Sequence, residues 1–288
     1  METVGHKPLW GFATESADIR EVDQTEVAIG NGKPIRDYNE LIRTLATIQY
    51  HNPDFVLMLR GQTRDYKSGA ATTLKPSILR GRDGHYPGRA ELDRRFRGLK
   101  NAERSLAEQF RSHNIPDPKQ RVFKHRIVRW AILQHYEVVD TPLLDVTLSP
   151  RIAASFASIS NREWGYIYVL AVPNISAAVT SSAEAGLQII RLSSVCPYIA
   201  MRPGVQEGYL LGEYPEIDAM ETKSLIPYEE TDFSLRPISK IKFRPRNFWD
   251  RSGISEAAHE HLYPEEDDGF GRMIEELKDD VRRQRGSL

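Results

Sequence analysis

Residues 55–62 read FVLMLRGQ, a short apolar run that ends in Arg60, Gly61 and Gln62. The turn-forming letters NPD precede the run at residues 52–54, and Gly61 bounds residues 55–60, which is typical of a buried β-strand. A polar group at the edge of such a strand needs a partner or a ligand. We therefore expect a functional site at the end of this strand.

A second stretch combines apolar and polar residues in a similar way. It reads LQHY at residues 133–136 and TPLLDVTLSP at residues 141–150. Residues 143–147 are predicted to form a strand, and Ser149 with Pro150 is typical of a helix N-cap followed by proline at the first helical position. Asp145 lies in this apolar strand, where a carboxylate must be paired. Asp145 could pair with Arg60, or Arg60 could bind a phosphate or carboxylate ligand.

Composition limits the class of protein. The chain has 288 residues, 40% of them hydrophobic, which allows one large domain or two small ones. A net charge of −1 gives no global basic excess for nucleic acid, and the single cysteine excludes an internal disulfide framework and a cysteine-rich zinc site. Residues 1–18 contain no signal-peptide pattern, and no run is long enough to span a membrane. A cytoplasmic protein with no membrane partner is expected.

Hydrophobic periodicity predicts both helices and strands. Helices are expected at residues 37–50, 90–112, 119–136 and 254–262, after Pro150, and around residues 270–281. Strands are expected at residues 55–60, 143–147, 166–172, 188–192, 205–211 and 239–243. Strands in the middle with helices near the ends predict an α+β fold, with a central, mostly antiparallel sheet flanked by helices.

Linked motifs give the chain a family resemblance. RGQ at residues 60–62, LKPSILR at 74–80, QHY at 134–136, TPLLDVT at 141–147 with a following SP, and QEG at 206–208 together resemble the bacterial FRG-domain family. The chain departs from the family pattern at four positions: Leu59 replaces an aromatic residue, Glu137 a glycine, Asp140 a proline and Val146 a tryptophan. The resemblance implies an FRG domain over residues 35–265, with residues 1–34 as an N-terminal extension and residues 266–288 as a C-terminal helix and basic tail.

The order of these motifs also resembles the three-motif layout of ADP-ribosyltransferases. That resemblance implies a split sheet and NAD as substrate, with no metal. It implies ADP-ribosyl transfer to a protein or nucleic-acid target, or NAD glycohydrolysis, in a bacterial toxin or phage-defence role. The nucleotide-binding residues would be Arg60, Gln62, Asp145, Thr147 and Ser149.

The ribose end of the implied site departs from the transferase pattern. Gln206 stands where a glutamate is expected, and glutamine has no negative charge to stabilise a developing cation. Gln206 and Glu207 are predicted on one strand, where neighbours point to opposite faces. Gln206 is expected to face the site, and a β-bulge would be needed to turn Glu207 toward it.

Two other interpretations remain open. His135 and Asp145 are a candidate acid–base pair for a hydrolase or nuclease, since a carboxylate can orient a histidine and keep it basic. A histidine on the apolar face of a helix is also typical of a packed core residue. The missing glutamate favours a non-catalytic module that binds a nucleotide or nucleic acid. The Ser149 hydroxyl could cap backbone donors, border an anion site at the helix N-terminus, or do both.

Overall fold

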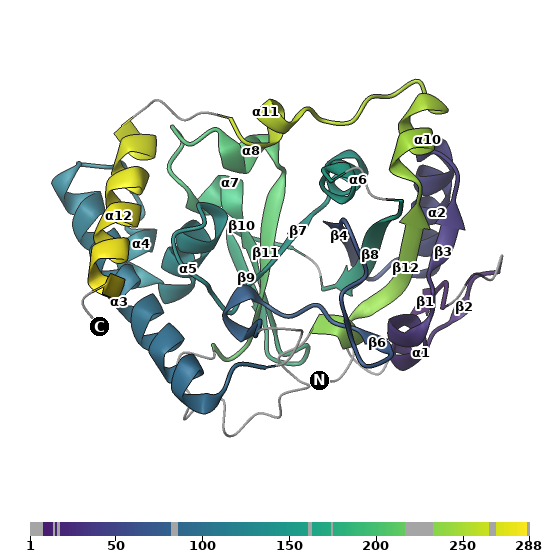
Figure 1. Ribbon diagram of the computed structural model, residues 1–288, viewed down its shortest axis with the longest axis horizontal. Helices are drawn as coiled ribbons and strands as arrows, with labels where there is room; N and C mark the ends of the chain where they lie inside the picture. Colours follow the sequence, from purple (N-terminus) through teal and green to yellow (C-terminus); the bar gives the residue numbers. More distant parts are fainter. Residues whose placement is uncertain are drawn as a thin grey trace.

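The computed structural model describes residues 8–13, 15, 18–81, 86–160, 163–173, 175–216, 233–264 and 269–286. Its centre is an eight-stranded sheet in the order β3-β12-β8-β4-β7-β11-β10-β9 (Figure 1). The pairing of β3 with β12 is parallel and the other neighbours in this sheet are antiparallel. The predicted α+β class with a mostly antiparallel sheet is confirmed. In sheet order, the strands span Lys33–Ile35, Pro237–Phe243, Gly165–Val172, Val56–Gln62, Leu144–Thr147, Gly208–Glu213, Leu187–Arg191 and Val179–Ser182.

The sheet consists of two halves that meet between β4 and β7. Strands β4 and β8 pair along the whole of Val56–Gln62. Strands β4 and β7, in contrast, are paired in the described structure at Leu59 and Thr147 alone. Figure 1 shows β11 and β10 on one side of this junction and β8 and β12 on the other. Met58 and Leu170 of one half and Leu144 and Leu211 of the other belong to one buried cluster, so the two halves share a core.

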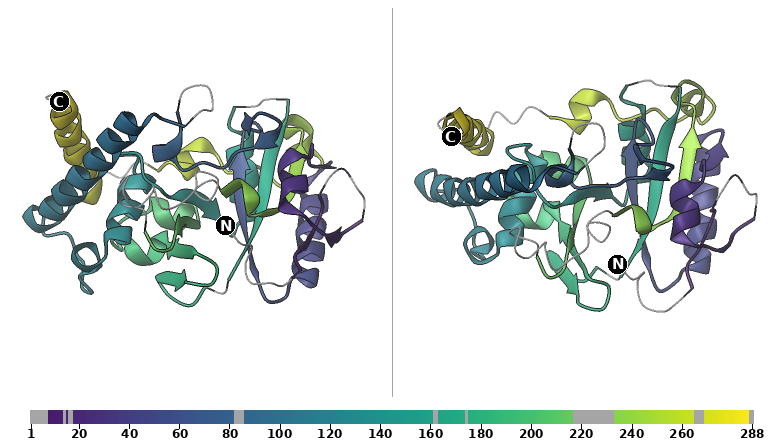
Figure 2. Two further views of the ribbon diagram at one scale, coloured as in Figure 1. Left: turned by 90° about the horizontal axis from the view of Figure 1, so that it is seen from below. Right: turned by 60° about the horizontal axis from the view of Figure 1, so that its bottom comes forward.

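Helices cover the outer surface of each half. One cluster joins the β12-β8-β4 half to α1 (Gln24–Ile29), α2 (Tyr38–His51), α6 (Pro150–Ser158) and α10 (Pro245–Asp250). Another joins the second half to α3 (Arg89–Ser112), α5 (Arg126–His135) and α12 (Gly269–Gly286). Both views in Figure 2 show α3 and α12 together at one end of the molecule and the purple N-terminal helices at the other.

The longer helices follow the predicted periodicity. The helices predicted at residues 37–50 and 90–112 are observed as α2 and α3, and the Asp37 side chain caps α2 by accepting from the Glu40 amide. The helix predicted at 119–136 divides into α4 (Arg121–Lys124) and α5, because His125 has an extended backbone. The helix predicted at 254–262 is reduced to α11 (His259–Leu262).

The strand predicted at residues 205–211 begins later, at Gly208. A helical turn, α8 (Arg202–Val205), precedes it, and the amides of Gln206 and Glu207 donate to the carbonyls of Arg202 and Gly204. Glu207 then adopts a left-handed φ of 44°. The prediction that Gln206 and Glu207 lie on one strand is therefore wrong, because the turn satisfies their amides locally.

Several short elements were not predicted. They are β1 (Trp10–Gly11), β2 (Arg20–Glu21), α1, β3, β5 (Lys67–Ser68), β6 (Ala71–Thr72), η1 (Ser77–Leu79), β9, α7 (Leu192–Val195), α8, η4 (Phe233–Leu235) and α10. The described N-terminal residues pack on the sheet: the Phe12 amide donates to the Ser239 hydroxyl at 2.7 Å, and β3 extends the sheet beside β12. None of the helices in the described ranges is long and apolar enough to cross a bilayer.

Candidate functional site

Two cavities meet where β4 and β7 separate, and both are lined by Arg60, Gly61 and Phe156. The smaller, called the junction cavity, has a volume of about 230 Å³, and the larger, called the basic cavity, about 700 Å³. The junction cavity is also lined by Gln134, His135, Glu137, Asp145, Thr147, Arg202, Gln206 and Tyr263. The basic cavity is also lined by Gln62, Tyr66, Lys67, Lys75 and Arg80.

Gly61 allows the close contact between β4 and α6 that shapes both cavities. A Cβ atom at Gly61 would lie 1.8 Å from the Ala153 carbonyl oxygen of α6, which is far inside van der Waals contact. Helix α6 therefore lies directly on β4, and its Phe156 reaches the wall shared by the two cavities.

Arg60 lies at the meeting point of the cavities, with a side chain that is 12% exposed. Its Nη1 donates to the Asp145 carbonyl oxygen at 2.7 Å and lies 4.0 Å from Asp145 Oδ2. Burial lowers the pKa of Arg60 to about 10, against the opposing effect of Asp145, so the guanidinium remains charged at neutral pH. Within the described part of the chain, its buried Nε has no hydrogen-bond partner. The predicted pairing of Arg60 with Asp145 is present, and the Nε donor of Arg60 is not used by any other described residue.

The Asp145 carboxylate is held by Gln134, which the sequence did not single out as a site residue. Gln134 Nε2 donates to Asp145 Oδ2 at 2.8 Å, and Gln134 Oε1 accepts from the hydroxyls of Thr141 and Ser77 at 2.8 and 3.3 Å. The Asp145 side chain is 49% exposed and lines the junction cavity. One feature of the sequence could have indicated Gln134. It is a polar residue that directly follows the apolar residues Ile132 and Leu133 of the same helix and precedes His135.

His135 is the last residue of α5 and is buried, as expected for a core histidine. Burial, followed by the positive charge of Arg202, lowers its pKa to about 3, so the ring is neutral near pH 7. Its Nε2 has no hydrogen-bond partner among the described residues. The predicted acid–base pair is not formed, because Gln134 rather than His135 contacts the Asp145 carboxylate.

Thr147 and Ser149 differ in how they relate to the site. Thr147 lines the junction cavity, where its hydroxyl donates to the carbonyls of Gln206 and Glu207 and accepts from the Ser149 amide. Thr147 therefore fastens the turn between α8 and β11. Ser149 occupies the N-cap of α6 with Pro150 after it, as predicted, but its side chain makes no capping hydrogen bond and lines neither cavity.

Gln206 and Glu207 are also separated by the structure. Gln206 lines the junction cavity, as predicted, and its amide donates to the Leu262 carbonyl at 2.7 Å. Glu207 is exposed and is not among the residues that line either cavity. The negative charge that the ribose end of the predicted site would need therefore does not come from these two side chains.

Arg202 is a second arginine of the junction cavity that the sequence did not indicate. It forms an ion pair with Glu137 at 3.0 Å, and its guanidinium lies over the rings of Tyr263 and Tyr136, 4.6 and 5.7 Å from their centroids. Glu137 has a left-handed φ of 56°, a conformation that glycine adopts without strain. Glycine is the residue that the FRG pattern has at this position.

The basic cavity extends from Arg60 along the other side of the junction. Four of its lining side chains are cationic: Arg60, Lys67, Lys75 and Arg80. Gln62 also lines it, and its buried Oε1 has no hydrogen-bond partner within the described ranges. The cavity thus offers positive charge and one free acceptor, which suits an anion that also carries a hydroxyl or amine.

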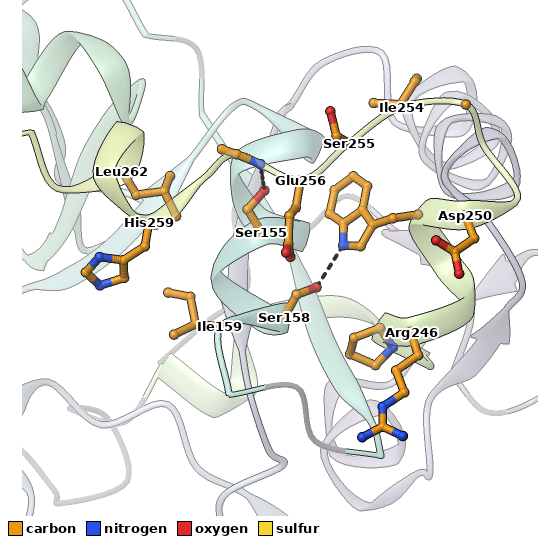
Figure 3. Close-up of a pocket in the computed structure, with 14 residues that line it drawn as sticks. Ser155, Ser158, Ile159, Arg246, Asp250, Ile254, Ser255, Glu256, His259 and Leu262 are labelled. Carbon is orange, nitrogen blue, oxygen red and sulfur yellow. Dashed lines mark hydrogen bonds between the residues drawn. The ribbon is translucent and has the colours of Figure 1, made fainter.

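A third cavity, of about 960 Å³, lies between α6, α10 and residues 253–259 (Figure 3). It contains none of the predicted site residues. Ser158 accepts from Trp249 Nε1 at 3.1 Å and Ser155 accepts from the Ala257 amide at 2.8 Å, so its hydroxyls join α6 to the segment that follows α10.

Comparison with known proteins identifies part of the chain. No curated protein and no solved structure matched the chain. The family model described as the FRG domain matches residues 57–164, which run from β4 to the residue before β8 and include Arg60, Gln134 and Asp145. The chain therefore contains an FRG domain, which the match places at residues 57–164.

Proposed function

We propose that this FRG-domain protein binds NAD across the junction cavity and the basic cavity and cleaves the bond between nicotinamide and ribose. The ADP-ribose is transferred to an acceptor on a protein or nucleic acid, or to water. The observation that carries this proposal is the buried Arg60 at the meeting point of the two cavities, whose Nε has no hydrogen-bond partner in the described part of the chain. A bacterial toxin or phage-defence role belongs to the same proposal and is supported by the family resemblance.

The charges around Arg60 suit a dinucleotide. A guanidinium binds phosphate oxygens in a planar, directional way, and Lys67, Lys75 and Arg80 add positive charge on the same side. Ligand cavities usually measure about 300–1,000 Å³, so the junction cavity alone is small for a dinucleotide, whereas the two cavities together are not. We assign the phosphates to the basic cavity and the nicotinamide ribose to the junction cavity.

The sheet geometry supports the same proposal. Arg60 lies on one half of the sheet, and Asp145 and Thr147 lie on the first strand of the other half. A cavity between the two halves is lined by side chains from both of them, while the buried cluster that the halves share stays intact. This arrangement is compatible with the split sheet implied by the resemblance to ADP-ribosyltransferases.

The test is nicotinamide release from NAD by the purified full chain, compared with an Arg60→Ala variant. Arg94→Ala serves as the control, because Arg94 lies on α3 with an exposed side chain outside both cavities. We expect release by the wild type and by Arg94→Ala, and loss in Arg60→Ala. No release by the wild type, with protein and nucleic-acid acceptors supplied, would refute the proposed activity.

The cationic lining of the basic cavity favours a second candidate, a non-catalytic module that binds a nucleic acid. Such binding depends on phosphate contacts and weakens steeply with salt. Fluorescence anisotropy with a labelled single-stranded oligonucleotide at several salt concentrations distinguishes the two functions. Salt-dependent binding that Arg80→Ala weakens, with no consumption of NAD, would favour this candidate.

A further inference from the structure

The proposed reaction needs a negative charge that the predicted residues do not supply. Loss of nicotinamide develops positive charge at C1′ of the ribose, which a fixed anion nearby stabilises. Gln206 is neutral, and Glu207 lies outside the cavities. We propose that Asp145 is the catalytic carboxylate of this site and that Gln134 is its positioning residue. This inference rests on the proposed NAD chemistry and names the residue that performs it.

The carboxylates near the junction cavity can be compared directly. Among the described residues, Asp145 and Glu137 are the acidic side chains that line it. Glu137 is committed to Arg202 at 3.0 Å, and its side chain is 70% exposed. Asp145 is half-exposed within a strand whose neighbours Leu144 and Val146 are buried, so its carboxylate lies at the cavity wall on a rigid element.

A short chain of hydrogen bonds holds the Asp145 carboxylate in place. Thr141 and Ser77 donate to Gln134 Oε1, which leaves Gln134 Nε2 to donate to Asp145 Oδ2. The orientation of the Gln134 amide is therefore set by two hydroxyls. A catalytic group works best when its rotamer is locked by such supporting contacts.

The position of Arg60 relates the carboxylate to the proposed ligand. Arg60 Nη1 lies 4.0 Å from Asp145 Oδ2, and the same side chain, whose buried Nε has no hydrogen-bond partner among the described residues, lines the basic cavity assigned to the phosphates. In NAD the phosphate next to the nicotinamide ribose is separated from C1′ by that one sugar. A phosphate bound at Arg60 therefore brings the ribose close to Asp145.

The chemical step then balances as follows. The bond between ribose C1′ and nicotinamide N1 breaks, and its electron pair goes to that nitrogen, which releases neutral nicotinamide. The oxygen or nitrogen of the acceptor, or of water, forms the new bond to C1′. Its proton passes to the Asp145 carboxylate and from there to solvent. The negative charge of Asp145 stabilises the cationic character of C1′ until that bond forms.

Two substitutions at Asp145 distinguish a catalytic role of its negative charge from a structural role of its side chain. Asp145→Asn is nearly isosteric and keeps a hydrogen bond to Gln134, whereas Asp145→Glu keeps the charge and lengthens the side chain. We expect Asp145→Asn to lower the kcat of nicotinamide release by about 100-fold or more, with little change in NAD affinity by calorimetry. We expect Asp145→Glu to retain more activity than Asp145→Asn. A structural role would give the opposite order, because the isosteric variant would then be the milder one.

Matched variants complete the experiment. Asp140→Asn, at an exposed position in the loop before β7, should leave kcat unchanged, and Glu207→Gln should also retain it. Thermal unfolding of each variant establishes that it is folded. Full kcat in Asp145→Asn, or loss of kcat in Glu207→Gln, overturns the assignment of Asp145. In either case, nicotinamide release by the wild type would still support the proposed function. Absence of nicotinamide release by the wild type overturns both.

Discussion

Arg60 Nη1 donates to the backbone carbonyl of Asp145 at 2.7 Å, so the guanidinium joins β4 to β7 next to their register pair Leu59–Thr147. The same side chain lines both cavities and keeps its Nε free within the described structure. One residue therefore connects the two halves of the sheet and places a positive charge at the wall of both cavities. The two roles use different atoms of the guanidinium, which a shorter or unbranched cation cannot reproduce.

Arg60→Lys should weaken the binding of ADP-ribose by at least about tenfold, equivalent to about 1.4 kcal/mol. Lysine keeps the positive charge, but it cannot donate to the Asp145 carbonyl and to a phosphate in fixed directions at once. Isothermal titration calorimetry with ADP-ribose measures the change, and Arg94→Lys on the exposed face of α3 is the control. Equal affinity in the Arg60→Lys and control variants would show that charge alone accounts for binding.

Gly61→Ala should destabilise the fold by about 1–3 kcal/mol, because the added Cβ would overlap the Ala153 carbonyl of α6. Gly98 lies within α3 with nothing within 4 Å of an added Cβ. Gly98→Ala should instead stabilise the fold by about 0.5–1 kcal/mol, since alanine favours a helix interior over glycine. Urea unfolding of the two variants compares them, and a neutral effect at Gly61 would contradict the close β4–α6 contact.

His135 should make the fold less stable in mild acid. Its pKa is lowered to about 3 in the folded state from an ordinary value of 6.5, so between these values the unfolded chain binds a proton that the folded chain does not. Stability therefore falls as the pH drops below about 6.5, by up to about 1.4 kcal/mol per pH unit from this residue. His135→Leu should reduce that slope.

Urea unfolding at about pH 7.5 and about pH 4.5 measures this slope. The control is His125→Gln, because His125 is exposed at the break between α4 and α5. If His135→Leu and the wild type lose the same stability in acid, the neutral buried state of His135 is wrong.

Asp65→Asn should destabilise the fold by about 3–5 kcal/mol, because it leaves a buried cation without its counterion. Lys240 has no exposed side-chain surface, and its Nζ donates to Asp65 Oδ2 at 3.0 Å and to the carbonyls of Ala28 and Gly30. Asp65 also accepts from the hydroxyl of Tyr168 at 2.9 Å.

The matched control for Asp65→Asn is the more exposed pair between Lys242 and Glu15, where the Glu15 side chain is 57% exposed. Glu15→Gln should change stability by at most about 1 kcal/mol, since exposed ion pairs contribute little. Chemical unfolding measures both variants. A similar small effect of both substitutions would mean that the carbonyls alone satisfy Lys240.

Local patterns in the sequence were sufficient to predict the strand at β4, the helices α2 and α3 and the proline start of α6. Each depends on periodicity, caps or turn residues that lie within a few positions of one another. The same patterns brought out Arg60 and Asp145, because polar residues at the edge of apolar strands stand out without a structure. The motifs around them also indicated the FRG family, which the match over residues 57–164 confirmed.

Other features depend on partners that are distant in the chain. Lys240 alternates with apolar residues and could pass for an exposed lysine, yet it is buried because Asp65, 175 positions away, supplies its counterion. The pairing of Gln134 with Asp145, the separation of His135 from that carboxylate, and the turn that removes Glu207 from the cavities were equally absent from the local pattern. Local patterns in the chain were therefore enough to predict the longer helices and strands and the polar residues that need partners, but not short elements such as α8 and β9. The tertiary structure alone decided which partners those polar residues have, because burial and hydrogen bonding join residues through space rather than along the chain.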